Sequence, residues 1–191
     1  MVAGKLAKKY EIKSQLIGPR DSDDKELKIL NRIIRWTPAG IEYEPDQRHA
    51  DMIVRDPGLT EANAVNTAGE YESRALEEEG EELYGESEST RYRALAARAN
   101  YLAADRPDIM YATKEICRSM AKPTQAAWGK VKRLGRYLQG SRRTAFKYEW
   151  QGDEEEVIGY TDSDWVGCRA TGKSTSGGAI CVGTHFIKRV V

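Results

Sequence analysis

The sequence predicts a mixed α/β (α+β) protein, in which a helical bundle is followed by a partial β-sheet. Three observations lead to this fold class. Apolar residues recur every three or four positions between residues 91 and 140, as in amphipathic helices. Apolar and polar residues alternate in short runs from residue 145 onward, as in strands. Residues 60–90, which separate the first 59 residues from the helices, are rich in glutamate and poor in large apolar residues, as in linkers.

Residues 1–59 are predicted to form a small α/β unit. The acidic cluster at residues 21–24 favours a helix start, because carboxylates cap helix N-termini and interact well with the helix dipole. A strand is expected over residues 41–44, and a second helix from about residue 46 to 54, before a turn at residues 56–58. The apolar face of the first predicted helix consists of Leu27, Leu30, Ile33 and Ile34.

Residues 60–90 are predicted to be an acidic linker. Residues 61–90 hold 10 acidic and 1 basic side chain, a net charge of −9. Residues 91–150 hold 14 basic and 4 acidic side chains, a net charge of +10, although the whole chain is neutral. The acidic segment has too few large apolar residues to offset the entropy lost on ordering. A solvated helix around residues 71–83 is the alternative.

Residues 91–144 are predicted to form a helical bundle. Three apolar stripes with helical spacing lie around Tyr92, Ile109 and Trp128, and their short connections favour a compact bundle. Basic side chains outside the third stripe suit contacts with a phosphate backbone, although a solvated helix face is an equally good explanation. These candidate nucleic-acid-binding residues are Lys130, Lys132, Arg133 and Arg136.

Residues 145–191 are predicted to form strands over the sequences FKYEW, VIGYTDSDWV and GGAICVG. Asp162 and Asp164 lie at the end of the middle strand and, with a period of two residues, on the same side of it. Carboxylates on a rigid strand can hold a divalent metal for phosphoryl chemistry. Both aspartates are therefore candidate metal ligands, and an exposed strand end is the alternative explanation.

Several classes of protein are excluded by composition. The chain has no run of about 18 apolar residues that could span a membrane, and its first residues lack the apolar core of a secretory signal. The three cysteines show no CxxC spacing and the two histidines lie far apart, so a structural zinc site is not expected. We therefore expect an intracellular protein, in the cytoplasm or nucleus, which is neither secreted nor bound to a membrane.

The order of these motifs resembles a known family. RPDI at residues 106–109 and RYL at 136–138 are followed by GYTDSDW at 159–165 and KSTSG at 173–177. Together they resemble the Pol polyprotein of copia-type LTR retrotransposons. In that family the helical block connects reverse transcriptase to ribonuclease H, and the GYTDSDW-like strand opens the ribonuclease H domain. Residues 1–59 resemble, more weakly, the segment that follows the polymerase palm.

The resemblance implies that residues 145–191 are an incomplete ribonuclease H-like domain. It also implies that Asp162 is the catalytic aspartate of the first ribonuclease H strand and a Mg²⁺ ligand, with Asp164 as its neighbour. The family's YVDD-type hairpin and the glutamate of its SSAEAEY-like segment have no counterpart in this sequence. Because two-metal hydrolysis needs several carboxylates, we expect a catalytically incomplete fragment of the reverse transcriptase and ribonuclease H region.

The partner expected for such a fragment is nucleic acid, either DNA or an RNA–DNA hybrid, bound weakly and without sequence preference. Two alternatives stay open. One is a Mg²⁺-dependent ribonuclease H that acts on RNA–DNA hybrids. The other is a pseudogene-like product without function.

Overall fold

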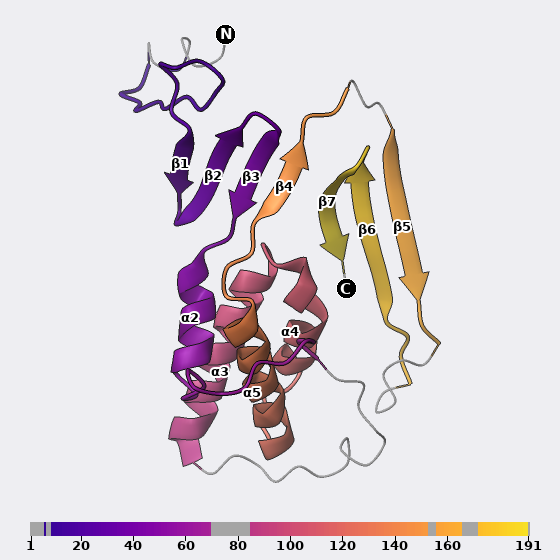
Figure 1. Cartoon of the computed structure of the whole chain (residues 1–191). Helices are drawn as coiled ribbons and strands as arrows, with labels where there is room; N and C mark the ends of the chain where they lie inside the picture. The colour runs from indigo at the N-terminus through magenta and orange to yellow at the C-terminus, as the bar shows by residue number, and fades with distance from the viewer. Residues whose placement is uncertain (1–5, 7–8, 70–84, 153–155, 166–171, 191) are drawn as a thin grey trace.

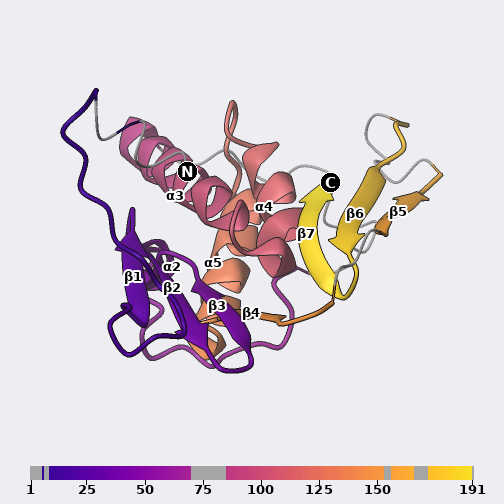
Figure 2. The ribbon, with the colours of Figure 1, turned by 90° about the horizontal axis from the view of Figure 1, so that it is seen from above.

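The computed structural model describes residues 6, 9–69, 85–152, 156–165 and 172–190. This part of the chain has a mixed α+β fold, as predicted, with four α-helices and two antiparallel sheets (Figure 1). The helices form a bundle below the first sheet, and the second sheet stands to one side of the bundle (Figures 1 and 2). No helix within the described ranges is both long and apolar enough to cross a membrane.

The first sheet joins segments from both halves of the chain. Its four antiparallel strands, in spatial order, are β1 (Glu26–Ile29), β2 (Arg32–Thr37), β3 (Gly40–Glu44) and β4 (Phe146–Glu149). In the pair formed by β3 and β4, a Cβ atom on Gly40 would lie 2.1 Å from the carbonyl oxygen of Tyr148, so only glycine fits there. The strand FKYEW, which we assigned to the C-terminal segment, thus pairs with the N-terminal strands.

The helix predicted from the apolar spacing at residues 27–34 is wrong, because this segment is a β-hairpin. Leu30 and Asn31 have φ angles of +49° and +64°, and two successive positive φ angles are typical of a type I′ hairpin turn. This turn places Leu27 opposite Ile34 on the two strands. Of the four apolar residues that seemed to share one helix face, Leu27 and Ile34 are therefore cross-strand neighbours, whereas Leu30 lies in the turn and Ile33 lies opposite Lys28.

The remaining predicted helices are confirmed. They are α2 (Gln47–Arg55), α3 (Gly85–Ala103), α4 (Met110–Cys117), which follows the short 3₁₀ helix η1 (Pro107–Ile109), and α5 (Gln125–Gly140). Asp46 caps α2 by accepting a hydrogen bond from the Arg48 backbone N–H, and Thr124 caps α5 by accepting one from that of Ala127. Helix α3 begins at Gly85, so it includes the last residues of the segment that we assigned to the linker. Residues 70–84 of that segment lie outside the described residues.

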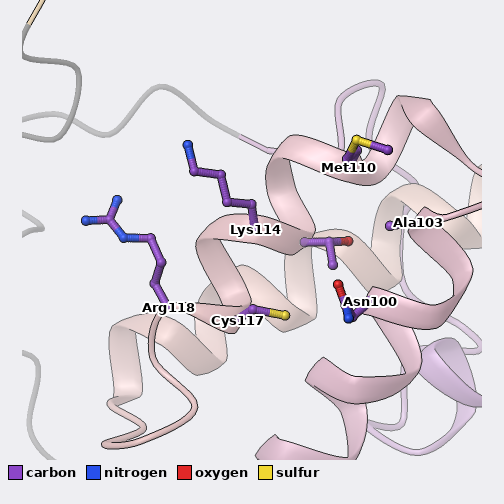
Figure 3. Close-up of a pocket in the computed structure, with 7 residues that line it drawn as sticks. Asn100, Ala103, Met110, Lys114, Cys117 and Arg118 are labelled. Atoms are coloured by element: carbon purple, nitrogen blue, oxygen red, sulfur yellow. The ribbon is translucent and has the colours of Figure 1, made fainter. Parts of the chain in front are cut away.

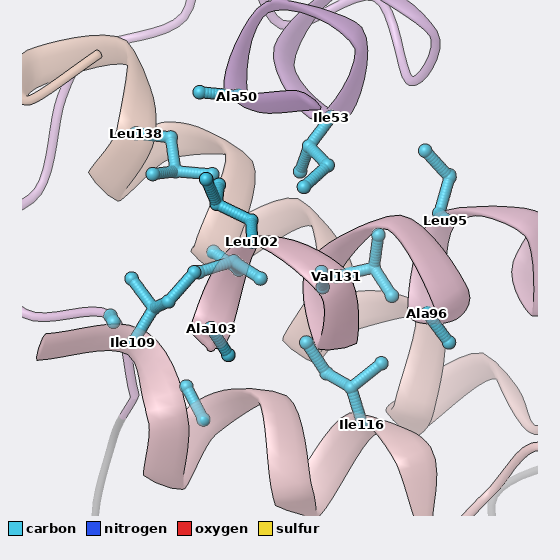
Figure 4. Close-up of a cluster of buried hydrophobic side chains, with 14 of the residues drawn as sticks. Ala50, Ile53, Leu95, Ala96, Leu102, Ala103, Ile109, Ile116, Val131 and Leu138 are labelled. Atoms are coloured by element: carbon cyan, nitrogen blue, oxygen red, sulfur yellow. The ribbon is translucent and has the colours of Figure 1, made fainter. Parts of the chain in front are cut away.

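All four helices contribute to one hydrophobic core (Figure 4). Within the described ranges, every buried side chain of this hydrophobic core lies between Ala50 and Leu138. The strands of both sheets lie outside this range, so the bundle supplies the buried core and the sheets pack around it. The largest aliphatic side chains of the core are Ile53, Leu95, Leu102, Ile109, Ile116, Leu134 and Leu138.

The second sheet is a three-stranded antiparallel meander. Its strands, in spatial order, are β5 (Val157–Ser163), β6 (Ser176–Val182) and β7 (His185–Val190), of which β7 was not predicted. Polar contacts join this sheet to the rest of the molecule. Lys114 donates a hydrogen bond to the Thr175 hydroxyl just before β6, and Arg189 donates one to the carbonyl of Pro107 in η1.

Candidate nucleic-acid interface

Helix α5 carries the four basic residues that the sequence singled out. Its buried face includes Val131, Leu134 and Leu138, as its apolar spacing predicted. Lys132 is exposed, whereas the other three basic side chains are half-buried. The four residues therefore differ in how accessible they are to a nucleic acid.

Arg133 and Arg136 contact the start of the predicted linker. Arg136 donates from Nε to the carbonyl of Asn63 at 2.8 Å, and Arg133 donates from Nη2 to the hydroxyl of Thr67 at 2.8 Å. The backbone N–H of Val65 also donates to the carbonyl of Arg136. These two predicted nucleic-acid ligands thus hold residues 60–69 against α5. The sequence did not reveal this role, because the partners lie more than sixty residues away.

A cation–aromatic cluster lies where α3 begins beside the start of α5. The guanidinium carbon of Arg91 lies 5.4 Å from the ring centroid of Trp128, which also contacts the ring of Tyr92. Lys132 is one helical turn beyond Trp128 on α5, so the two side chains share a face. We call Arg91, Trp128 and Lys132 the α3–α5 surface. Sequence analysis found Trp128 and Lys132 but missed Arg91, because only the tertiary fold brings α3 to this place.

The RPDI and RYL motifs meet in a buried polar network. Arg106 is 1% exposed, and its guanidinium donates to both carboxylate oxygens of Asp108 at 2.8 and 2.6 Å. It also donates to the carbonyl of Ser141, while the Tyr137 hydroxyl donates to Asp108. Burial raises the pKa of Asp108, but the hydrogen bonds and charge of Arg106 outweigh it and hold the pKa below its ordinary value. These motif residues connect the end of α5 to η1.

The two predicted metal ligands lie at the end of β5. Asp162 is exposed and pairs with Gly177 of β6. Asp164 follows the last residue of β5, and its carboxylate accepts a hydrogen bond from the backbone N–H of Thr175. Within the described ranges, no three His, Cys, Asp or Glu side chains are grouped so that they could hold a metal ion. The donors that the structure describes around these two aspartates therefore do not by themselves supply the several converging carboxylates that a two-metal centre needs.

Comparison with known proteins shows a distant similarity. No family model matches the chain, and no solved structure gives a significant match. The chain is 27% identical over 156 residues, 81% of its length, to an uncharacterized mitochondrial protein of Arabidopsis thaliana, of which it covers 62%. It is 29% identical over 150 residues, 78% of its length, to the retrovirus-related Pol polyproteins from transposons RE2 and RE1 of the same plant.

The chain spans only 10% of each of these Pol polyproteins and less than two thirds of the mitochondrial protein. The resemblance to copia-type Pol polyproteins is thus supported as a distant relation over about four fifths of the chain.

Proposed function

We propose that this relative of retrotransposon Pol polyproteins binds the nucleic-acid backbone through its α3–α5 surface, without sequence preference and without cleaving the strand. The observation that carries the proposal is the cation–π contact of Arg91 with Trp128 beside the exposed Lys132. The similarity to two Pol polyproteins supports nucleic acid as the partner.

The chemistry of this surface suits a polyanion. Lys132 has an ammonium group that can neutralise a phosphate, and each such contact releases condensed counterions. The guanidinium carbon of Arg91 lies 5.4 Å from the Trp128 ring centroid, and a guanidinium carries five N–H donors for phosphate oxygens. The Trp128 ring is half-buried against the core with Arg91 over it, so the contacts available to a nucleic acid are those of the two cations. The surface therefore favours contacts with the nucleic-acid backbone, which carry no sequence preference.

The test is fluorescence anisotropy with labelled single-stranded and duplex oligonucleotides of unrelated sequences, at several salt concentrations. Replacing Arg91→Gln together with Lys132→Gln should weaken binding and reduce the salt slope by up to about two. The matched control is Lys28→Gln with Lys188→Gln, which removes the same charge from exposed residues on the two sheets. The control should lose much less affinity.

Three results would count against the proposal. Binding curves of the Arg91 and Lys132 variant that superimpose on those of the unchanged protein at every salt concentration would remove the α3–α5 surface as the interface. If Arg133→Ala with Arg136→Ala alone reduced the slope, the sequence-based assignment to those arginines would be preferred. Mg²⁺-dependent cleavage of an RNA–DNA hybrid that disappears in Asp162→Asn would instead favour the ribonuclease H alternative.

A further inference from the structure

A cleft lined by both polar and apolar side chains lies between α3 and α4, on a part of the molecule that the proposed function does not use (Figure 3). Its volume is about 460 Å³. Helix α3 supplies one wall, and Figure 3 shows Asn100 of α3 close to Cys117 of α4 across the cleft. The lining residues are Asn100, Ala103, Met110, Thr113, Lys114, Cys117 and Arg118.

The lining includes a buried hydroxyl group without a partner. Thr113 is 2% exposed, and its Oγ1 atom has no hydrogen-bond partner within the part of the chain that the structure describes. A threonine within a helix commonly satisfies its hydroxyl by donating to the carbonyl four residues earlier. Buried polar groups are nearly always paired, so an unpaired hydroxyl in a cleft wall is a natural donor to a ligand.

Two cations stand on the α4 side of the cleft, one helical turn apart. Lys114 and Arg118 extend from the same side of α4 in Figure 3. Lys114 donates one hydrogen bond to the Thr175 hydroxyl at 3.2 Å, and an ammonium group has three N–H donors. Arg118 contacts Glu115 through Nη1, and a guanidinium has five donors. Glu115 offsets part of this charge from outside the cleft, whose described lining contains no carboxylate.

We infer that this cleft binds a phosphoryl group. The oxygens of a phosphate accept hydrogen bonds only, which matches a lining that offers the Thr113 hydroxyl, the Asn100 amide and two cations. The Lys114 and Arg118 side chains are long enough to bend over a bound anion and neutralise it. None of these residues belongs to the α3–α5 surface, so the inference holds or fails independently of the proposed function.

The inference is tested by NMR titration of the ¹⁵N-labelled protein with inorganic phosphate at constant ionic strength. Amide shifts should change at Thr113 and its neighbours in α4.

The variant Thr113→Val keeps the side-chain volume and removes the unpaired hydroxyl, so the free protein should fold normally and bind phosphate about 3- to 10-fold more weakly. Lys114→Gln, a half-buried position, should weaken binding by a similar factor. The matched control Lys28→Gln removes one charge from an exposed position on β1, outside both proposed sites, and should leave phosphate binding unchanged.

A second titration with a thymidine octanucleotide identifies the source of the phosphoryl group. Shifts at Thr113 with both ligands would mean that the cleft accepts a phosphodiester of a nucleic-acid strand. Shifts with inorganic phosphate alone would mean that it accepts a free phosphate group. If phosphate leaves the α4 amides unshifted, or binds equally to the unchanged protein, Thr113→Val and Lys114→Gln, the inference is wrong.

Discussion

Arg106 shows how a residue recognised in the sequence acquires its role only in the fold. The RPDI motif could be read from the sequence, but the partners of Arg106 include Ser141, which lies 35 residues later at the end of α5. A buried guanidinium is tolerated only when its charge and its donors are matched. Asp108 provides the opposite charge and two hydrogen-bond acceptors, and Arg106 also donates to Ser141. The motif therefore holds η1 against the end of α5.

Replacing Asp108→Asn should destabilise the protein by up to about 3 kcal/mol, because it leaves the charge of Arg106 buried without a counter-ion. The effect should depend on pH. Because the folded pKa of Asp108 is depressed, its carboxylate stabilises the fold above the unfolded pKa near 4, and this stabilisation is lost as pH falls through the folded value. The variant should therefore lose less stability than the unchanged protein when pH is lowered below about 4.

Urea unfolding at pH 7 and pH 3 measures both effects. The exposed Asp51→Asn on α2 is the control for the loss of one negative charge. Equal stabilities of Asp108→Asn and Asp51→Asn at pH 7 would show that the buried ion pair does not stabilise the fold.

At the scale of elements, the sequence predicted structure wherever the local signals agreed. Helices α2 and α5 have capping residues, Asp46 and Thr124, followed by an apolar stripe, and both were found. The hairpin of β1 and β2 was mistaken for a helix, because its turn uses Leu30 and Asn31 rather than the common Asn-Gly pair. Leucine rarely adopts a positive φ angle, so nothing local in the sequence marked this turn.

Two glycines within α5 should respond in opposite ways to substitution with alanine. A Cβ atom on Gly129 would meet nothing within 4 Å, so Gly129→Ala should stabilise the protein by about 0.5–1 kcal/mol through helix propensity. A Cβ atom on Gly135 would lie 2.5 Å from Cδ1 of Leu59 and 3.2 Å from the carbonyl oxygen of Ile53 on α2. Gly135→Ala should therefore cost about 1–3 kcal/mol through overpacking.

Thermal and urea unfolding of the two variants measure this difference. Because both substitutions lie on one helix and add the same methyl group, each variant is the control for the other. A Gly135→Ala protein as stable as Gly129→Ala would mean that α2 and α5 do not pack as closely as the structure shows.

At the scale of the whole molecule, tertiary contacts decide what the candidate site can do. Arg91 lies beside Trp128 only because folding brings α3 next to α5. Residues 60–69 accept hydrogen bonds from Arg133 and Arg136, two of the four basic residues that the sequence proposed as nucleic-acid ligands. Asp162 and Asp164 were correctly placed at a strand end, but within the described ranges no further donors converge on them. Charge and spacing in the sequence could identify the candidate residues, whereas their accessibility and partners depend on segments far apart in the chain.

The first sheet is tied to the helices more strongly than the second. The buried Glu44 of β3 accepts hydrogen bonds from Arg35 of β2 and from Arg143 just beyond α5, and Asp105 accepts them from Arg32 and Tyr43. These ion pairs connect two strands to the ends of α3 and α5. Since β4 hydrogen-bonds to β3, it completes this unit. Among the residues described, neither sheet contributes a side chain to the cluster of buried apolar residues, so these ion pairs are what ties the first sheet to the helices.

This arrangement predicts different outcomes for two shortened chains. A chain that ends after residue 152 lacks β5–β7 but retains the bundle and the first sheet, so it should keep its helical circular dichroism signal and a single cooperative thermal transition. A chain that ends after residue 144 also lacks β4 and leaves β3 with an unpaired edge. It should unfold about 3–8 °C lower than the 152-residue chain, which corresponds to about 1–2 kcal/mol. If the two chains unfold at the same temperature, β4 does not stabilise the first sheet. If the 152-residue chain fails to fold, the bundle depends on the second sheet through contacts such as that of Lys114 with Thr175.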